Sequence, residues 1–116
     1  MCFKRMKVIL IVCIVVQLLS TGFTFAYSRN NAILYADNYS QSPNQMNSLG
    51  QGYNFYGWGS DCANFASQCM NAGSFGQDSY WYSTVSFSSN VPHRTDSYTW
   101  RVSQSLKEHL KNNGKL

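Results

Sequence analysis

Cysteine is the residue type whose position in this sequence most clearly suggests chemistry. Cys62 lies in the segment Asp-Cys-Ala-Asn-Phe-Ala-Ser-Gln-Cys, which spans residues 61–69. Asp61 is a typical helix N-cap residue, so the pattern predicts a helix that begins at Cys62. A cysteine attacks as its thiolate, and a helix N-terminus favours this form because its free N–H groups attract negative charge. Cys62 is therefore our candidate nucleophile, and its backbone N–H is a candidate oxyanion donor.

A second cysteine, Cys69, follows two turns later on the same predicted helix. It lies far from the helix N-terminus, so we expect it to pack in the core. The alternative to a nucleophilic role for Cys62 is that it too packs in the core, because a free cysteine is most often a small buried hydrophobe. Seven residues of helix separate the two by roughly 10 Å, whereas a disulfide needs Cα atoms within about 7 Å. Both thiols should be free.

Residues 1–26 have the pattern of a secretory signal peptide. Their apolar run, residues 8–19, suits a signal sequence and is short for a membrane span. Thr24 and Ala26 place small residues at the recognition positions of signal peptidase, and three cations precede the run: Lys4, Arg5 and Lys7. We expect cleavage after Ala26 and a secreted or cell-wall-associated protein. The alternative is an uncleaved anchor, which would be the only link to a membrane.

The remaining segment, residues 27–116, is nearly neutral. It carries six Lys and Arg side chains against five Asp and Glu side chains, a formal net charge of +1. Nucleic-acid binding requires a basic surface that neutralises phosphates, and six scattered cations do not form one. We therefore expect no nucleic-acid partner. About 90 residues are enough for one small domain.

Three segments have the pattern of helices and one has that of a strand. Helices are predicted over residues 30–39, 61–73 and 99–114, with loops at 40–52 and 53–60. Gly73 is expected to end the second helix in a left-handed conformation. Residues 80–85 are β-prone, but no second strand shows clear alternation. The pattern predicts the helical first half of an α+β domain, with little or no sheet and partly uncovered helix faces.

The order of these motifs resembles the bacterial putative amidase domain family, which is similar to papain-like cell-wall peptidases. The motifs that carry the resemblance are Y-S-R-N-N-A-I-L-Y-A-D-N-Y, G-W-G-S-D-C-A-N-F-A-S-Q-C-M-N-A-G, W-Y and Y-T-W-R-V-S-Q-S-L-K-E-H-L-K-N-N-G. They extend over residues 27–116, and D-C-x-N-F-x-S-Q is the most specific part. The resemblance implies that Cys62 is the nucleophile. It further implies hydrolysis of amide bonds in cell-wall peptide or a similar exported substrate, without metal or cofactor.

The sequence departs from the family pattern at the general base. In such domains this base is a histidine at the start of the sheet, downstream of the last helix. The two histidines here are His93, in the predicted loop 91–96, and His109, which we expect on the solvated face of the last helix. His93 is only a weak candidate, with Asp96 to orient it. We therefore expect the sequence as printed to stop before the catalytic histidine and to be inactive.

Two other functions fit the composition. One is a non-catalytic secreted protein that binds cell wall or carbohydrate, with aromatic side chains as stacking surfaces for sugar rings. Its candidates are Trp58, Trp81 and Trp100. The other is a small secreted protein with a structural or inhibitory role. A histidine in a strand context after Leu116 in the coding frame would favour the enzyme over both.

Overall fold

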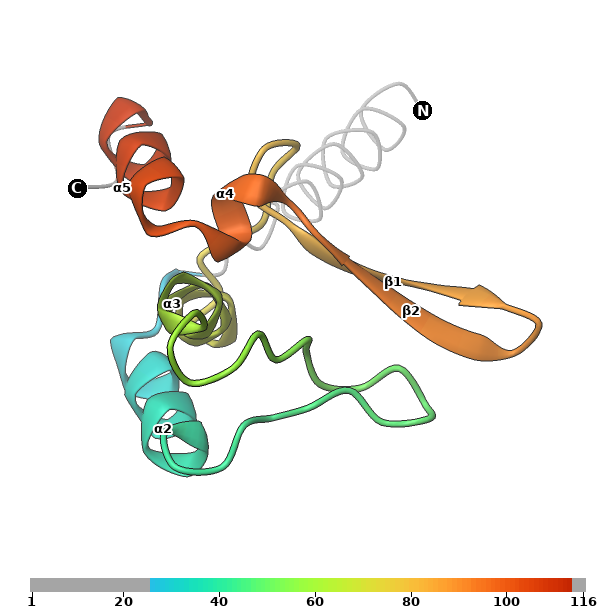
Figure 1. Cartoon of the computed structure of the whole chain (residues 1–116). Helices are drawn as coiled ribbons and strands as arrows, with labels where there is room; N and C mark the ends of the chain where they lie inside the picture. The colour runs from blue at the N-terminus through green and yellow to red at the C-terminus, as the bar shows by residue number, and fades with distance from the viewer. Residues whose placement is uncertain (1–25, 114–116) are drawn as a thin grey trace, which may run out of the picture.

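The computed structural model describes residues 26–113, so our predictions for residues 1–25 lie outside it. Figure 1 shows a group of helices from which one long hairpin projects. This α+β fold with little sheet confirms the predicted fold class. In the described part of the chain, no helix has the length and hydrophobicity to cross a bilayer. The elements are α2 (Arg29–Tyr39), α3 (Cys62–Ala72), β1 (Ser83–Ser88), β2 (Val91–Asp96), α4 (Tyr98–Arg101) and α5 (Ser103–Asn112).

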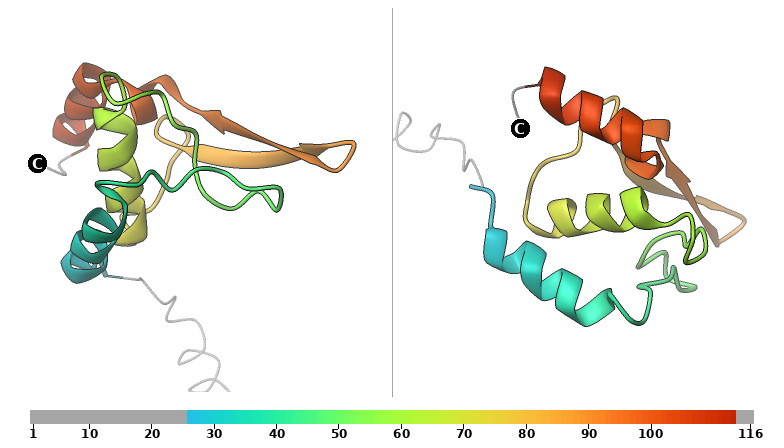
Figure 2. Two further views of the ribbon diagram at one scale, coloured as in Figure 1. Left: turned by 60° about the horizontal axis from the view of Figure 1, so that its bottom comes forward. Right: turned by 60° about the vertical axis from the view of Figure 1, so that its left-hand side comes forward.

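Helix α3 lies at the centre of the molecule, between α2 and α5 (Figure 2, right). Its buried face is mainly polar and consists of Ala63, Asn64, Ser67 and Gln68. Cys62 and Ala66, on the opposite side of the helix, are exposed. A polar side chain inside a protein must find hydrogen-bond partners, because an unpaired one costs free energy. The neighbours of α3 are therefore held by hydrogen bonds as well as by apolar contact.

Ser67 connects α3 to the two buried tryptophans. Its Oγ donates to the Trp100 carbonyl oxygen at 2.8 Å and accepts from Trp81 Nε1 at 2.9 Å. The second indole is held in a similar way, because Trp100 Nε1 donates to Asn64 Oδ1 at 2.8 Å. All four residues are fully buried. Each indole N–H is thus paired with a polar side chain of α3.

The apolar core is built around the stacked rings of Trp81 and Trp100, whose centroids lie 5.0 Å apart. Ala63 of α3 packs against them, together with Leu106 and Leu110 of α5. Because aromatic rings bury a large area each, two tryptophans replace many of the Val, Ile and Leu side chains that a core of this size usually needs.

Helix α2 packs against α3 through Ala32 and Tyr35. Ser28 caps it by accepting from Asn31 N at 3.2 Å. Ala32 is buried, and the Tyr35 hydroxyl donates to Gln68 Oε1 at 2.7 Å. On its other side, Ile33 and Leu34 are 49% and 58% exposed. This agrees with the expectation that apolar side chains on the helices are partly uncovered.

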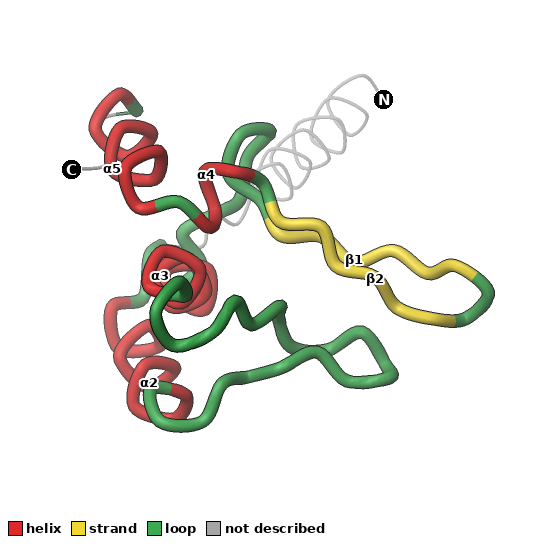
Figure 3. Tube along the Cα trace, viewed as in Figure 1, coloured by secondary structure: helices red, strands yellow, loops and turns green. Residues whose placement is uncertain are grey.

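The sequence prediction missed strand β2, which it treated as a loop. Residues 91–96 pair antiparallel with β1, with Val85 opposite Arg94. Figure 3 shows the two strands forming an arm that extends away from the helices. Ser89 and Asn90 join them with φ of 49° and 63°. Two consecutive positive φ values are typical of the tight turns whose twist matches a hairpin. The turn brings residues 91–96 alongside β1, and they form a strand although apolar and polar residues do not alternate clearly along them.

Arg94 fastens the base of this arm to the preceding loop. Its guanidinium lies over the Tyr53 ring, 4.7 Å from the centroid. The same group donates to the Gly50 carbonyl oxygen at 3.2 Å and to Ser83 Oγ at 3.1 Å. A cation that is both stacked and hydrogen-bonded holds the loop and the hairpin in one arrangement.

Two predictions about helix ends were wrong. The last helix is not continuous over residues 99–114, because Val102 is extended, with φ −116° and ψ 119°, and separates α4 from α5. Gly73 has φ −78°, and the left-handed residue is Ser74 at 64°. Glycine is needed at position 73 for a different reason. A Cβ there would lie 2.8 Å from the Ser28 carbonyl oxygen, because Ser28 N donates to Gly73 O.

The prediction that His109 lies on a solvated face was also wrong. Its side chain is only 10% exposed, and Nε2 lies 2.8 Å from Asp78 Oδ2. The other carboxylate oxygen accepts from the backbone N–H groups of Tyr80 and Trp81, each at 2.8 Å. The pair thus ties α5 to the segment that leads into β1.

We predict that Ser67→Ala destabilises the protein by about 1–3 kcal/mol, because the Trp81 N–H and the Trp100 carbonyl lose a buried partner. Urea unfolding followed by circular dichroism measures the change. The control is Ser79→Ala, at an exposed serine, which should leave the midpoint unchanged. Equal midpoints for the two variants would contradict the role given to Ser67.

We predict that Asp78 contributes to stability in a pH-dependent way. Burial alone would raise the pKa of Asp78, but the N–H groups of Tyr80 and Trp81 and the imidazole of His109 outweigh it and lower the pKa. Ionised Asp78 therefore adds stability above the ordinary aspartate pKa of about 3.9, and this contribution is lost as the pH falls through the lower, folded-state pKa.

Asp78→Asn keeps acceptor oxygens but removes the ionisation. The variant should be less stable than the parent at neutral pH and should lose less stability on acidification below about pH 4. Urea midpoints measured from neutral to acidic pH test this, with Asp37→Asn, at an exposed position of α2, as the control. An acid response identical to that of the parent would exclude this contribution.

Candidate active site

Cys62 is the first residue of α3, and its side chain is exposed. The helix begins where the sequence predicted, so the thiol lies beside the N–H groups of the first turn. Such N–H groups favour an anion nearby, either a thiolate or a developing oxyanion. The geometry thus supplies one requirement for nucleophilic catalysis at this residue, access to the thiol, and places it at the start of a helix.

We predicted that Asp61 caps the helix, but its side chain does not do so. It has φ −100° and ψ −2° and makes no side-chain capping hydrogen bond, because a capping residue normally adopts an extended conformation. Its Oδ1 accepts instead from Tyr56 N at 3.0 Å and from Asn64 Nδ2 at 2.8 Å. The carboxylate therefore fastens the preceding loop, and no capping side chain occupies the N–H groups at the start of α3.

Asn64 fixes the loop that leads into α3, residues 53–60. Its Nδ2 donates to the Asn54 carbonyl oxygen at 2.7 Å as well as to Asp61, while its Oδ1 is paired with Trp100. This side chain is fully buried. One amide thus sets the position of the loop relative to both the helix start and the core, and so orients the surroundings of Cys62.

Asp96, at the end of β2, holds the other side of this loop. Its Oδ2 accepts from Asn54 Nδ2 at 2.9 Å and from the Tyr56 hydroxyl at 2.8 Å. Burial raises the pKa of Tyr56, and the neighbouring carboxylate of Asp96 raises it further, so the hydroxyl stays a neutral donor. Asp96 thus positions the loop, and its hydrogen bonds go to loop residues, not to His93.

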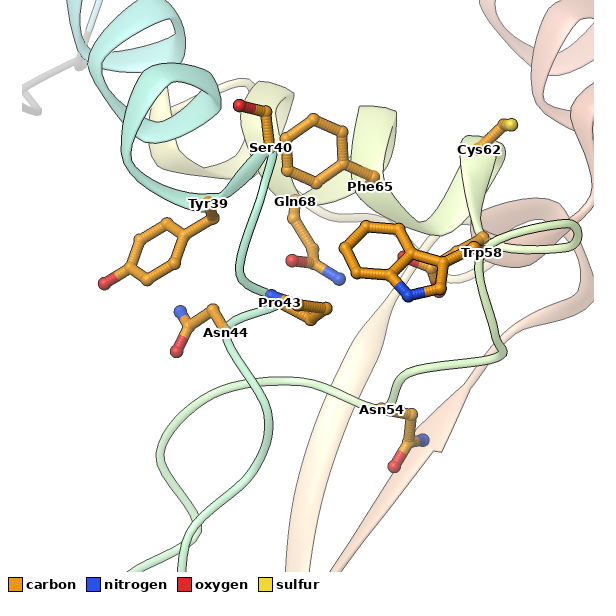
Figure 4. A pocket seen from close by; sticks show the side chains of 10 residues that line it. Tyr39, Ser40, Pro43, Asn44, Asn54, Trp58, Cys62, Phe65 and Gln68 are labelled. Atoms are coloured by element: carbon orange, nitrogen blue, oxygen red, sulfur yellow. The ribbon is translucent and has the colours of Figure 1, made fainter.

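Two cavities meet at Cys62. The first, which we call the amide-lined cavity, measures about 150 Å³ and is shown in Figure 4. The second is an apolar groove of about 270 Å³ between α3 and α5, lined by Cys62, Ala63, Ala66, Ser103, Leu106, Lys107 and Leu110. In Figure 4 the sulfur of Cys62 points away from the side chains of the amide-lined cavity. Cys62 thus belongs to the lining of both the amide-lined cavity and the apolar groove.

Cys69 is half-buried, and it lines neither of these cavities. It forms no disulfide with Cys62, as predicted. Burial raises the pKa of the Cys69 thiol, which lowers its thiolate population at neutral pH. The expectation that Cys69 packs in the core was only partly right. The fully buried face of α3 is the mainly polar one, and Cys69 does not belong to it.

The structure places neither histidine at Cys62. His93 lies on β2 of the projecting hairpin, opposite Ser86, and is exposed. His109 pairs with Asp78 on α5. Neither residue lines the amide-lined cavity or the apolar groove. Within residues 26–113, no three His, Cys, Asp or Glu side chains group together in a way that could hold a metal ion.

The tryptophans divide into two classes. Trp81 and Trp100 are fully buried, so they are core residues and cannot stack on a ligand as the binding-protein alternative required. Trp58 is 66% exposed and forms a wall of the amide-lined cavity. It contacts the Phe55 ring edge-to-face, with centroids 5.2 Å apart.

A family model described as a putative amidase domain matches residues 26–116. The chain belongs to this family. The match confirms the resemblance recognised in the motifs and supports amide hydrolysis as the class of reaction. No curated protein and no solved structure matches the chain.

In this amidase domain, much of the motif around Cys62 has a structural role. Asn64, Ser67 and Gln68 form the buried hydrogen bonds of α3, which the sequence analysis did not assign. Three amide or hydroxyl side chains at positions i, i+3 and i+4 share one helix face. Because a polar helix face ordinarily faces solvent, the sequence alone did not indicate that this face is buried.

We predict that iodoacetamide at mildly acidic pH labels Cys62 before Cys69. The first thiol is exposed beside free helix N–H groups, whereas the second is half-buried with a raised pKa. Peptide mapping after short reaction times measures both rates, and concentrated urea serves as the control, because unfolding should remove the difference. Faster labelling of Cys69 in the folded protein would contradict this account.

Proposed function

We propose that this amidase domain is an exported cysteine hydrolase of the papain-like type, which cleaves amide bonds in cell-wall peptide or a similar exported substrate. The observation that carries the proposal is the exposed thiol of Cys62 at an uncapped helix N-terminus, where two cavities meet. Family membership supports the reaction, and the signal-peptide pattern of residues 1–26 supports export.

In the proposed reaction, the Cys62 thiolate attacks the substrate carbonyl carbon, and the carbonyl oxygen becomes an oxyanion. The N–H groups of the first turn of α3 stabilise this charge. The amine leaves with a proton, and water then hydrolyses the thioester to release the acid and regenerate the thiol. A peptide that crosses Cys62 would contact the amide-lined cavity on one side and the apolar groove on the other.

Protonation of the leaving amine requires a positioned acid, which in the papain-like mechanism is an imidazole. The two histidines of this sequence lie away from both cavities at Cys62. Because this help is typically worth about 10²–10⁴-fold in rate, residues 27–116 should show no measurable hydrolysis of cell-wall peptides by themselves.

The test uses purified cell-wall peptides and detects released amine. If the reading frame continues past Leu116 into a histidine-bearing segment, the longer protein should hydrolyse these peptides. Cys62→Ala should then abolish activity, whereas Cys69→Ala, outside both cavities, should retain it. Hydrolysis by residues 27–116 that His93→Ala removes without loss of structure would show that His93 is the base and that this account is wrong.

Export is tested separately. We predict that protein from the culture medium begins at Tyr27, because signal peptidase should cut after Ala26. Mass spectrometry of the intact protein measures the N-terminus. Protein that retains residues 1–26 and stays with the membrane fraction would contradict secretion, although it would leave the reaction at Cys62 unaffected.

A further inference from the structure

Gln68 presents a hydrogen-bond donor to the amide-lined cavity. The residue is only 4% exposed and lines this cavity. Its Oε1 accepts from Tyr35, but its Nε2 has no hydrogen-bond partner among residues 26–113. Figure 4 shows the amide nitrogen turned toward Pro43 and the side on which Trp58 lies. Nε2 is not one of the buried side-chain atoms that lack a partner, which in the described part of the chain are Arg94 Nε and Asp96 Oδ1. It is therefore accessible from the cavity and can donate to a ligand acceptor there.

Gln68 belongs to a chain of hydrogen bonds with Tyr35 and Asn44. Asn44 Nδ2 donates to the Tyr35 hydroxyl at 3.1 Å, so the hydroxyl hydrogen is directed to Gln68 Oε1. Burial raises the pKa of Tyr35, which keeps the hydroxyl protonated as a donor. With the hydroxyl donating in this direction, Gln68 Oε1 accepts and Nε2 faces the cavity.

Trp58 adds a flat apolar surface to the same cavity. Its ring is 66% exposed and is supported by contact with Phe55. Apart from Cys62, the proposed nucleophile, Asp61 is the one ionisable acid or base in the described lining, and its Oδ1 is already engaged by two N–H groups. The volume of about 150 Å³ far exceeds the roughly 10–15 Å³ needed for one water. The lining thus fits a small, neutral group with one strong acceptor and an apolar side.

We propose that the amide-lined cavity binds an acetamido-type group of the substrate, next to the bond that Cys62 attacks. The carbonyl oxygen accepts from Gln68 Nε2, and the apolar side of the group or of its ring stacks on Trp58. This inference rests on the proposed function and deepens it, because it specifies what the substrate carries beside the scissile amide. N-acetylated sugars and N-acetylated peptides both supply such a group.

Binding is measured with the full chain carrying Cys62→Ala, so that no turnover is needed. The probes are N-acetylglucosamine, glucose as the matched sugar without the acetamido group, and N-acetylalanine methylamide. Tryptophan fluorescence reports on the exposed Trp58, and the NMR signals of the Gln68 side-chain amide report on its hydrogen bond. We expect at least one acetamido probe to shift both signals and glucose to shift neither.

Two variants test the contacts. Gln68→Glu keeps an acceptor for Tyr35 but removes the donor, and Trp58→Ala removes the stacking surface without disturbing the core. Each should weaken binding by about tenfold, the effect of losing one net hydrogen bond or ring contact. Tyr80→Ala, at an exposed aromatic residue outside the lining of this cavity, is the matched control and should bind normally.

The outcomes separate this proposal from the catalytic one. Binding of the sugar alone or of the peptide alone identifies the source of the acetamido group, and both outcomes support the proposal. Equal binding of glucose and N-acetylglucosamine, unchanged affinity in both cavity variants, or no binding of any probe would overturn it. Normal binding, together with no hydrolysis by a longer protein that carries a histidine-bearing segment after Leu116, would instead contradict the proposed reaction and leave the cavity assignment intact.

Discussion

The hydroxyl of Ser67, placed between the Trp81 indole and the Trp100 carbonyl, is the contact on which the rest of the fold depends. It is fully buried, and in a protein interior an unpaired polar group is costly and a paired one selects a single geometry. Asn64 and Gln68 act in the same way toward the entry loop and α2. Helix α3 therefore cannot rotate about its axis without breaking bonds to three parts of the molecule, and the direction of Cys62 is fixed.

The loop before α3 shows how this constraint reaches the site. Residues 53–60 have no regular secondary structure, yet Asn54 and Tyr56 are both held by Asp96. Asp61 and Asn64 hold the loop from the helix side. A loop held at both sides can carry Trp58 in one position as a wall of the cavity. Preorganisation of this kind reduces the entropy lost when a ligand binds.

Local chemistry in the sequence was enough to place α2, the start of α3 and the two free thiols. The α+β class with little sheet also followed from helical periodicity and from the shortage of alternating segments. Strand β2 was missed because its formation depends on a tight turn at Ser89 and Asn90 and on pairing with β1. The break at Val102 and the pairing of His109 with Asp78 were missed because both depend on packing between distant segments.

The residues of helix α3 that maintain the fold lie on one face of the helix, and Cys62 lies on the opposite face. The side chains that maintain the fold point inward from Asn64, Ser67 and Gln68, while Cys62 and Ala66 point outward. Substitutions on the outer face can alter reactivity or the shape of the groove with little effect on the hydrogen bonds that hold the helix. The exposed residues around Cys62 can therefore change without unfolding the helix, provided that Cys62 itself is kept for the proposed chemistry.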